Sequence, residues 1–218
     1  MKPKLLLLPE KSKSSDIVTE YLFGRGIDIE IINECIRKGI IFESLPYHNA
    51  VFVGMDQNNK PRYAAYRATN NSRIMGDASG SDKRFSFRLT GNSESTLHVF
   101  ESAIDALSYA TLLKLDCRDW RAYNLLSLAG VYGAKKNIED CKLPAALDQF
   151  LKEHPKTSTI VLHLDNDRAG RIATEAIIYN LRDHYVVVDT PPPQGKDVND
   201  FLCAKLGIKR KKERSYER

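Results

Sequence analysis

Acidic side chains follow two hydrophobic runs of the sequence, where each run gives way to a helix-forming stretch. Glu101 comes directly after residues 97–100, and Asp165 and Asp167 come at the end of residues 160–164. A carboxylate at the carboxyl end of a buried strand points into the crevice where open α/β sheets bind ligands. Three acids that converge there would form a hard, oxygen-rich site, which suits Mg²⁺ and a phosphate-bearing substrate.

Each of these acids also has a simpler interpretation when it is taken alone. Glu101 can favour the amino end of the following helix, and Asp165-Asn166-Asp167 is a common turn sequence. The combination favours chemistry, because two acids spaced i and i+2 on an extended loop can face one cation. A third acid from a neighbouring strand can bridge to that cation or act as a general base.

Further charged residues are expected near the same edge of the sheet. Asp105 lies one helical turn beyond Glu101 and faces the same side, so it would support the site from outside the metal ligands. Asp197 and Asp200 follow the last predicted strand; the first is a further candidate metal ligand and the second a further supporting acid. Lys196 beside them would supply a cation for a phosphate.

Strands and amphipathic helices alternate along the second part of the chain. Hydrophobic runs predict strands at residues 97–100, 124–129, 160–164 and 185–188. Apolar residues at helical spacing follow the first three strands, and a short last helix begins near residue 200. This alternation predicts an α/β fold with a mostly parallel sheet and helices on both faces.

The first part of the chain has a different pattern. Two short helices are expected early, with Ser15 and Asp28 as their caps, followed by a β-hairpin over residues 50–68. Polar and glycine-rich residues 69–81 predict a loop. Residues 81–88 then predict a strand.

That last strand mixes cations with aromatic residues. Lys83, Arg84 and Arg88 alternate with phenylalanines, which fits a strand that contacts phosphates and bases. The same mixture is also common on ordinary exposed strands. We predict a small α+β subdomain over residues 1–92, a catalytic domain over 93–206 and a basic, disordered tail over 207–218.

Composition excludes several classes of protein. The net charge of the 218 residues is +5, and residues 209–218 alone contribute +4, so charge does not argue for nucleic-acid binding by the folded part. The four cysteines show no Cys-x-x-Cys pair, which argues against zinc and indicates a reducing cytoplasm. No apolar run approaches the roughly 20 residues of a membrane span, so we expect no membrane contact.

These motifs carry a family resemblance. Residues 97–205 resemble the TOPRIM domain of bacterial primases, type IA and type II topoisomerases and some nucleases. The family pattern is a glutamate after the first strand and an Asp-x-Asp after a later one, which in primases continues as Arg168-Ala169-Gly170 does here. Residues 195–200 resemble the primase-type Gly-Lys-Asp-x-x-Asp/Glu segment. The upstream part resembles the small DUF3991-like domain found before TOPRIM in plasmid and mobile-element proteins.

The resemblance implies Mg²⁺-dependent nucleotidyl transfer on a single-stranded DNA template, with Mn²⁺ as a possible substitute. Glu101 would be the general base or a metal bridge, and Asp165 and Asp167 the metal ligands. Lys83 and Arg84 would hold phosphates of the nucleotide or template. Such a protein would serve DNA replication or mobile-element maintenance, with single-stranded DNA and nucleotides as ligands and a helicase or relaxase as partner.

The sequence also departs from the family, and other functions stay open. A cysteine-rich zinc module and the nucleophilic tyrosine of topoisomerases are not found, and Ser102 stands where glycine is common. A metal-dependent nuclease would use the same acids to activate water. A haloacid-dehalogenase-like phosphatase would use Asp165 as nucleophile and Asp167 as acid. A non-catalytic module that binds nucleic acid beside a helicase or relaxase is the third alternative.

Overall fold

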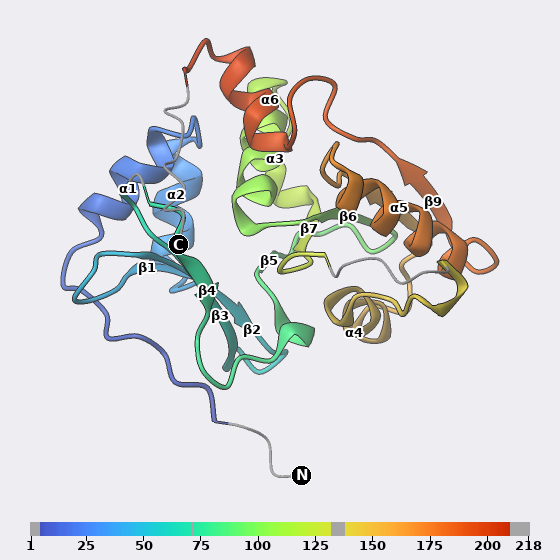
Figure 1. The fold of residues 1–218 in the computed structure, drawn as a ribbon, viewed down its shortest axis with the longest axis horizontal. Coiled ribbons are helices and arrows are strands. Elements are labelled where there is room, and N and C mark those ends of the chain that lie inside the picture. Colours follow the sequence, from blue (N-terminus) through green and yellow to red (C-terminus); the bar gives the residue numbers. More distant parts are fainter. Residues whose placement is uncertain (1–4, 71, 132–137, 210–218) are drawn as a thin grey trace.

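The chain forms two neighbouring parts, each built on a sheet of its own (Figure 1). The computed structural model describes residues 5–70, 72–131 and 138–209. One sheet has four strands in the order β1-β2-β3-β4, and the other has five in the order β5-β7-β6-β8-β9. Most of the basic tail predicted for residues 207–218 lies outside the described residues.

The first part consists of two helices and an antiparallel sheet. Its elements are α1 (Asp16–Phe23), α2 (Ile29–Arg37), β1 (Ile41–Glu43), β2 (Ala50–Met55), β3 (Pro61–Arg67) and β4 (Met75–Asp77). Asp28 caps α2 as expected, because its side chain accepts a hydrogen bond from the Glu30 backbone. Ser15 makes no such bond to α1. The buried carboxylate of Glu43 accepts from the first backbone N–H groups of α1 instead, at 3.0 and 3.3 Å.

Two segments of the first part differ from the prediction. The loop expected at residues 69–81 contains β4, which pairs antiparallel with β3. The strand expected at residues 81–88 is a 3₁₀ turn, η1 (Lys83–Phe85), followed by the short strand β5 (Arg88–Leu89). The turn forms because the Asp82 side chain accepts a hydrogen bond from the Arg84 backbone at 3.1 Å.

The second part confirms the predicted α/β architecture. Strands β6 (Thr96–Phe100), β7 (Asn124–Ser127), β8 (Thr159–Leu162) and β9 (Val186–Asp189) run parallel, and β5 joins β7 antiparallel at one edge. The helices are α3 (Ala103–Leu115), α4 (Ala145–Glu153), α5 (Arg168–Leu181) and α6 (Val198–Lys205), with 3₁₀ turns η2 (Trp120–Ala122) and η3 (Ile138–Asp140). Among the described residues, no helix combines the length and apolar character needed to cross a membrane.

Successive residues of β6 face opposite sides of this sheet, and both sides are covered. Leu97 and Val99 pack with α4 and α5, whereas Phe100 packs with α3. The core on the α3 side continues into the first part, because Val18 and Leu22 of α1 belong to the same cluster. The two parts therefore share a hydrophobic core, and the boundary expected at residue 92 stays a prediction.

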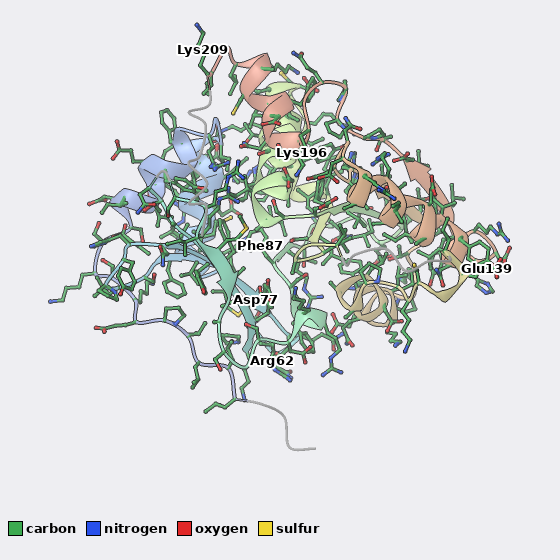
Figure 2. All side chains as sticks on the ribbon, in the orientation of Figure 1. Arg62, Asp77, Phe87, Glu139, Lys196 and Lys209 are labelled. Carbon is green, nitrogen blue, oxygen red and sulfur yellow. The ribbon has the colours of Figure 1, made fainter. Side chains whose placement is uncertain are left out.

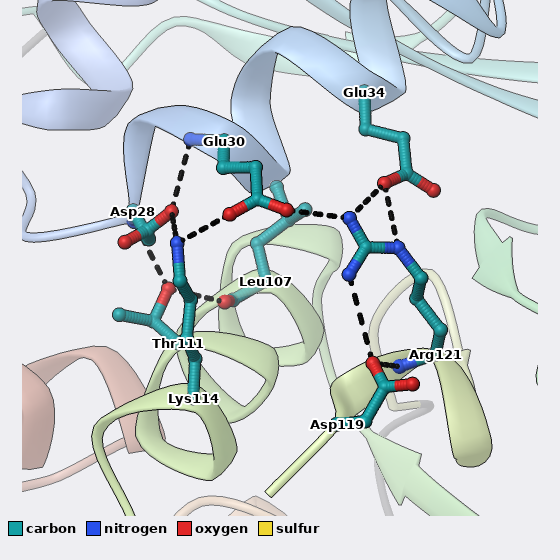
Figure 3. Close-up of polar contacts among 8 residues, drawn as sticks. All are labelled: Asp28, Glu30, Glu34, Leu107, Thr111, Lys114, Asp119 and Arg121. Atoms are coloured by element: carbon teal, nitrogen blue, oxygen red, sulfur yellow. Dashed lines mark hydrogen bonds and ion pairs between the residues drawn. The ribbon is translucent and has the colours of Figure 1, made fainter. Parts of the chain in front are cut away.

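Ion pairs reinforce the contact between α2 and the second part (Figure 3). The Lys114 ammonium lies 2.7 Å from a carboxylate oxygen of Asp28 and of Glu30. The Arg121 guanidinium lies 2.6 Å from Glu30 and from Glu34. Hydrogen bonds from Lys114 and Arg121 lower the pKa of Glu30 to about 2. These contacts hold α2 against α3 and η2.

Candidate functional site

The order of the strands places two of the predicted acids at one edge of the parallel sheet. Strand β6 lies between β7 and β8, so the chain that leaves β6 first crosses to one neighbour and later reaches the other. Glu101 follows β6 and Asp165 follows β8, and both strands run in the same direction. The acids therefore lie at the point where open α/β sheets form their binding crevice.

Backbone contacts bring these two acids together. One carboxylate oxygen of Glu101, Oε1, accepts a hydrogen bond from the Asp165 backbone N–H at 3.2 Å. A Cβ atom at Gly170 would lie 2.7 Å from this oxygen and 2.3 Å from the Asp165 carbonyl oxygen. The glycine of the Arg-Ala-Gly sequence thus lets the first turn of α5 approach the site.

A cleft of about 910 Å³ opens between the two parts of the molecule. On one side it is lined by the acidic residues Glu101, Asp105, Asp165, Asp197 and Asp200, together with Lys196. The opposite side, from β3, β4 and the segments next to them, contributes Tyr66, Arg67, Arg73, Met75, Asp77 and Lys83. In Figure 2, the label of Asp77 marks the four-stranded sheet and that of Lys196 the segment before α6. A largely acidic wall thus faces a wall of mixed character, on which three cations and a tyrosine lie beside Asp77 and Met75.

A lysine joins the two aspartates of the Asp-x-Asp motif. The Lys196 ammonium lies 2.9 Å from Oδ2 of Asp165 and 3.0 Å from Oδ2 of Asp167. The hydrogen bond to Asp165 is the main cause of a raised pKa of Lys196. Asp167 also caps α5, because its Oδ1 accepts a hydrogen bond from the Gly170 N–H at 3.0 Å. The two aspartates therefore already face one shared positive charge.

The surroundings shift the pKa values of the acids in different directions. Burial, followed by the charge of Asp165, raises the pKa of Glu101 to about 7. Burial also raises the pKa of Asp165, while the hydrogen bond from Gly170 lowers the pKa of Asp167. A carboxyl group that titrates near neutral pH is suited to accept and release protons in catalysis.

The carboxylates suit a magnesium ion that keeps part of its water. In the described residues, no three His, Cys, Asp or Glu side chains are placed to enclose one metal ion. Mg²⁺ is commonly bound by one or two carboxylates, with water and substrate phosphates as its other ligands. Asp165 and Asp167 offer two carboxylate oxygens to one cation, with Glu101 beside them. This donor set fits such an ion.

The other predicted acids, which are the candidate metal ligand Asp197 and the supporting acids Asp105 and Asp200, also line the cleft. Asp197 caps α6 and accepts a hydrogen bond from the Asp200 N–H at 2.7 Å, and Asp200 accepts one from the Lys196 N–H at 3.1 Å. Asp105 is buried, and its Oδ2 accepts a hydrogen bond from the Ser102 hydroxyl at 2.5 Å. Ser102, where the family commonly has glycine, caps α3. Burial and the charge of Asp197 raise the pKa of Asp105.

The structure brings only two of the four predicted phosphate-binding cations to the cleft. Lys83 and Lys196 line it, and the Lys83 ammonium donates to the Ala129 carbonyl oxygen at 2.9 Å. Contrary to expectation, Arg84 lies outside it and pairs with Asp82 at 2.7 Å. Arg88 is directed inward, because its guanidinium binds Glu153 at 2.7 Å and its side chain is only 11% exposed. The unexpected 3₁₀ turn at residues 83–85 causes this separation.

Sequence reasoning missed the residues that form the opposite wall. Tyr66 and Arg67 end β3, and Arg73 and Met75 precede or begin β4. The hairpin sequence offered a signal, since its returning strand ends in a tyrosine and an arginine. This signal was not used, because residues 69–81 were expected to form a loop rather than to contain a strand that pairs with β3.

Two histidines of the strand regions, His98 and His163, belong to the core. The rings of His98 and His163 stack with centroids 5.3 Å apart, and both residues are buried. Burial lowers the pKa of His98 to about 4 and that of His163 to about 3. They therefore stay neutral near physiological pH.

Comparison with known proteins assigns both parts of the chain. Residues 98–202 match the family described as Toprim-like, and residues 20–93 match a protein family of unknown function, DUF3991. The fold is similar to the primase fragment of the bacteriophage T7 primase-helicase protein, with a TM-score of 0.57 and 20% identity over 85% of this chain and 68% of the other. It is also similar to the RNA polymerase domain of Mycobacterium tuberculosis primase DnaG, with a TM-score of 0.58 and 12% identity over 90% and 74% of the two chains.

Two curated proteins are related in sequence. An uncharacterized protein of Bacillus anthracis is 24% identical over 199 residues, which are 81% of this chain and 52% of the relative. A 65 kDa protein of Zymomonas mobilis is 26% identical over 210 residues, 91% of this chain and 33% of the relative. The chain thus spans about half and about a third of these relatives.

The second part of the chain thus matches the Toprim-like family, and the fold of the chain is similar to that of primase catalytic domains. In this chain the Toprim-like domain follows a DUF3991 domain.

Proposed function

We propose that this protein catalyses Mg²⁺-dependent nucleotidyl transfer on single-stranded DNA, in the manner of a DNA primase. The observation that carries the proposal is the placement of Glu101 beside Asp165, the first acid of the Asp165-Asn166-Asp167 motif, at the edge of the parallel sheet. Glu101 and Asp165 both line the cleft. The Toprim-like match and the fold shared with primase catalytic domains support it. One of the similar structures is a DnaG primase catalytic domain bound to single-stranded DNA.

The carboxylates would have different roles at the reacting phosphate: some would bind the metal ion and one would accept a proton. Asp165 and Asp167, with Asp197 nearby, would hold Mg²⁺, which supplies polarisation of a phosphoryl oxygen and charge for the leaving group. Glu101 would take the proton of the attacking hydroxyl, because its pKa of about 7 leaves it half ionised near neutral pH. Asp105 and Asp200 would orient Ser102 and Lys196 from behind.

The opposite wall would position the rest of the substrate. Arg67, Arg73 and Lys83 place positive charge in the cleft for phosphates. Tyr66 offers a ring on which a base can stack, a contact that tolerates any sequence. Single-stranded DNA and nucleotides are therefore the ligands we propose, and residues 93–206 the catalytic domain.

The wider setting follows from the same proposal. We propose a role in DNA replication or mobile-element maintenance in the cytoplasm, with a helicase or relaxase as partner. The T7 neighbour is named as a primase-helicase protein, which supports a helicase as the partner to test first.

Primer synthesis tests the proposal. The purified protein would be incubated with labelled single-stranded DNA, ribo- or deoxyribonucleotides, and Mg²⁺ or Mn²⁺. We expect extended products, and a loss of roughly 10²-fold or more on Glu101→Gln, the range for removing a general base. Glu94→Gln is the matched control, because Glu94 is exposed and pairs only with Lys156 in the described structure.

The outcomes separate the alternatives. Undiminished synthesis by Glu101→Gln would refute the role of this residue. Shortening of the labelled strand that depends on the same acids would identify a nuclease, since water would then replace the attacking hydroxyl.

A further inference from the structure

Lys196 has an anchored backbone and an exposed side chain. Its carbonyl oxygen accepts a hydrogen bond from the Asn166 N–H at 2.7 Å, and its N–H donates to Asp200 at 3.1 Å. The Asn166 side chain also donates to the carbonyl oxygens of Pro192 and Gly195, at 2.8 and 3.2 Å. Asn166, the middle residue of the Asp-Asn-Asp motif, thus holds the loop before α6 next to the site through these hydrogen bonds. The Lys196 side chain is 54% exposed and can rotate without moving this backbone.

The ammonium of Lys196 uses the oxygens that a metal ion would need. It contacts Oδ2 of both Asp165 and Asp167 within 3.0 Å. A divalent cation on these oxygens would stand in contact with the ammonium, and two positive charges at such a distance repel each other even in a partly exposed site. The lysine and the metal therefore exclude each other.

We propose that Lys196 is a built-in competitor for the divalent cation, which displaces its ammonium from Asp165 and Asp167 when it binds. The inference rests on the metal role of the two aspartates under the proposed function. In the unliganded protein the lysine balances part of the charge of Asp165 and Asp167. It thereby lowers the affinity of the site for a metal that arrives without substrate.

Displacement from the two aspartates would also allow the Lys196 ammonium to bind a substrate phosphate. Because the backbone of Lys196 is fastened to Asn166 and Asp200, the released ammonium stays within one side-chain length of the site. A substrate phosphate on the metal would then find a free cation beside it. The metal ion and a phosphate ligand should therefore bind more tightly together than separately, because each favours the state in which the Lys196 ammonium is released from Asp165 and Asp167.

A metal titration tests the competition directly. Binding of Mn²⁺ would be measured by the electron paramagnetic resonance of the free ion, and binding of Mg²⁺ by calorimetry, both without nucleotide. We expect Lys196→Met to tighten binding by roughly three- to tenfold, the scale of the ion pairs it removes. Lys205→Met is the matched control, because Lys205 pairs with Asp116 at 2.8 Å and lies outside the cleft.

A second measurement uses the wild-type protein, so this test does not depend on whether Lys196→Met folds correctly. Acetic anhydride modifies only the neutral amine, so the ion pairs should protect Lys196. We expect acetylation of Lys196, measured by mass spectrometry, to rise several-fold with Mg²⁺, while that of Lys205 stays constant.

The outcomes separate this inference from the proposed function. If the wild type binds metal but Lys196→Met binds it equally or more weakly, the competition is wrong and the metal site stands. Unchanged acetylation of Lys196 at saturating Mg²⁺ would overturn the competition in the same way. If neither protein binds metal at millimolar concentration, the metal site of the proposed function falls, and the competition falls with it.

Discussion

Individual acids at this site differ because their surroundings differ. Glu101 is half-buried and has a pKa near neutral, whereas Asp167 is hydrogen-bonded at a helix start, which lowers its pKa. Such a separation commonly distinguishes the proton acceptor from the ligands in an active site. The sequence could indicate the three acids, because their place after hydrophobic runs is visible there. It could not indicate which one is protonated near neutral pH, because burial depends on the packing of distant segments.

The raised pKa of Glu101 predicts a dependence of stability on pH. Its value is 4.5 unperturbed and about 7 in the folded protein, so folding favours the protonated form. This contribution is complete below pH 4.5 and is lost as the pH rises through 7. Glu101→Gln should therefore stabilise the protein at pH 8 by about 1–2 kcal/mol, after allowance for partial exposure, and hardly at all at pH 4.5.

Chemical denaturation of both proteins at the two pH values, without divalent metal, measures this effect. An equal stability difference at both pH values would show that the carboxyl group is not shifted.

A second prediction concerns the glycine that borders the site. A methyl group at Gly170 would lie 2.3 Å from the Asp165 carbonyl oxygen, so Gly170→Ala must push α5 away from the two acids. We expect a loss of about 1–3 kcal/mol in unfolding free energy and weaker Mn²⁺ binding. Gly24→Ala is the control, because the nearest atom to its added methyl group is 3.2 Å away. Equal effects of both substitutions would contradict the close approach of α5.

At the scale of elements, long and buried helices and strands could be predicted from the sequence, whereas short ones could not. Strands β6 and β8 and their helices were predictable, because β6 is buried on both faces and β8 is buried on one face and half-buried on the other, which leaves apolar runs in the sequence. The three-residue strand β4 was not, since it is defined by its pairing with β3 rather than by its own residues. The contact of Lys196 with the Asp-x-Asp motif was not predictable either, because it depends on the path of the loop after β9.

The attachment of α6 to the first part gives an element-level prediction. Asn199 of α6 is buried, and its side chain donates to the Arg25 carbonyl oxygen at 2.9 Å and to the Ser108 hydroxyl at 3.0 Å. Asn199→Ala would leave these groups without that donor, so we expect a loss of about 2–3 kcal/mol. Arg121→Met removes the ion pairs of Arg121 in Figure 3 but leaves Glu34 paired with Lys38, so it should cost less.

Urea denaturation of the two variants compares the contacts. If Arg121→Met proved as costly as Asn199→Ala, the surface ion pairs rather than the buried amide would hold the parts together.

At the scale of the whole molecule, the cleft joins the two parts into one site. The Toprim-like domain supplies the acids, and the antiparallel sheet of the preceding domain supplies Tyr66, Arg67 and Arg73 on the facing wall. A shared core and the contacts of α2 hold these two walls of the cleft in fixed positions relative to each other. The sequence indicated an acidic edge but not this partner wall, because the contact between two sheets is a tertiary property.

A divalent cation at Asp165 and Asp167 is central to the proposed function, and a crystal soaked in Mn²⁺ tests for it most directly. We predict an anomalous-scattering peak in contact with carboxylate oxygens of both aspartates, with the Lys196 ammonium moved away from them. Soaked crystals that show no ion at these two residues, and Lys196 still paired with both, would contradict it.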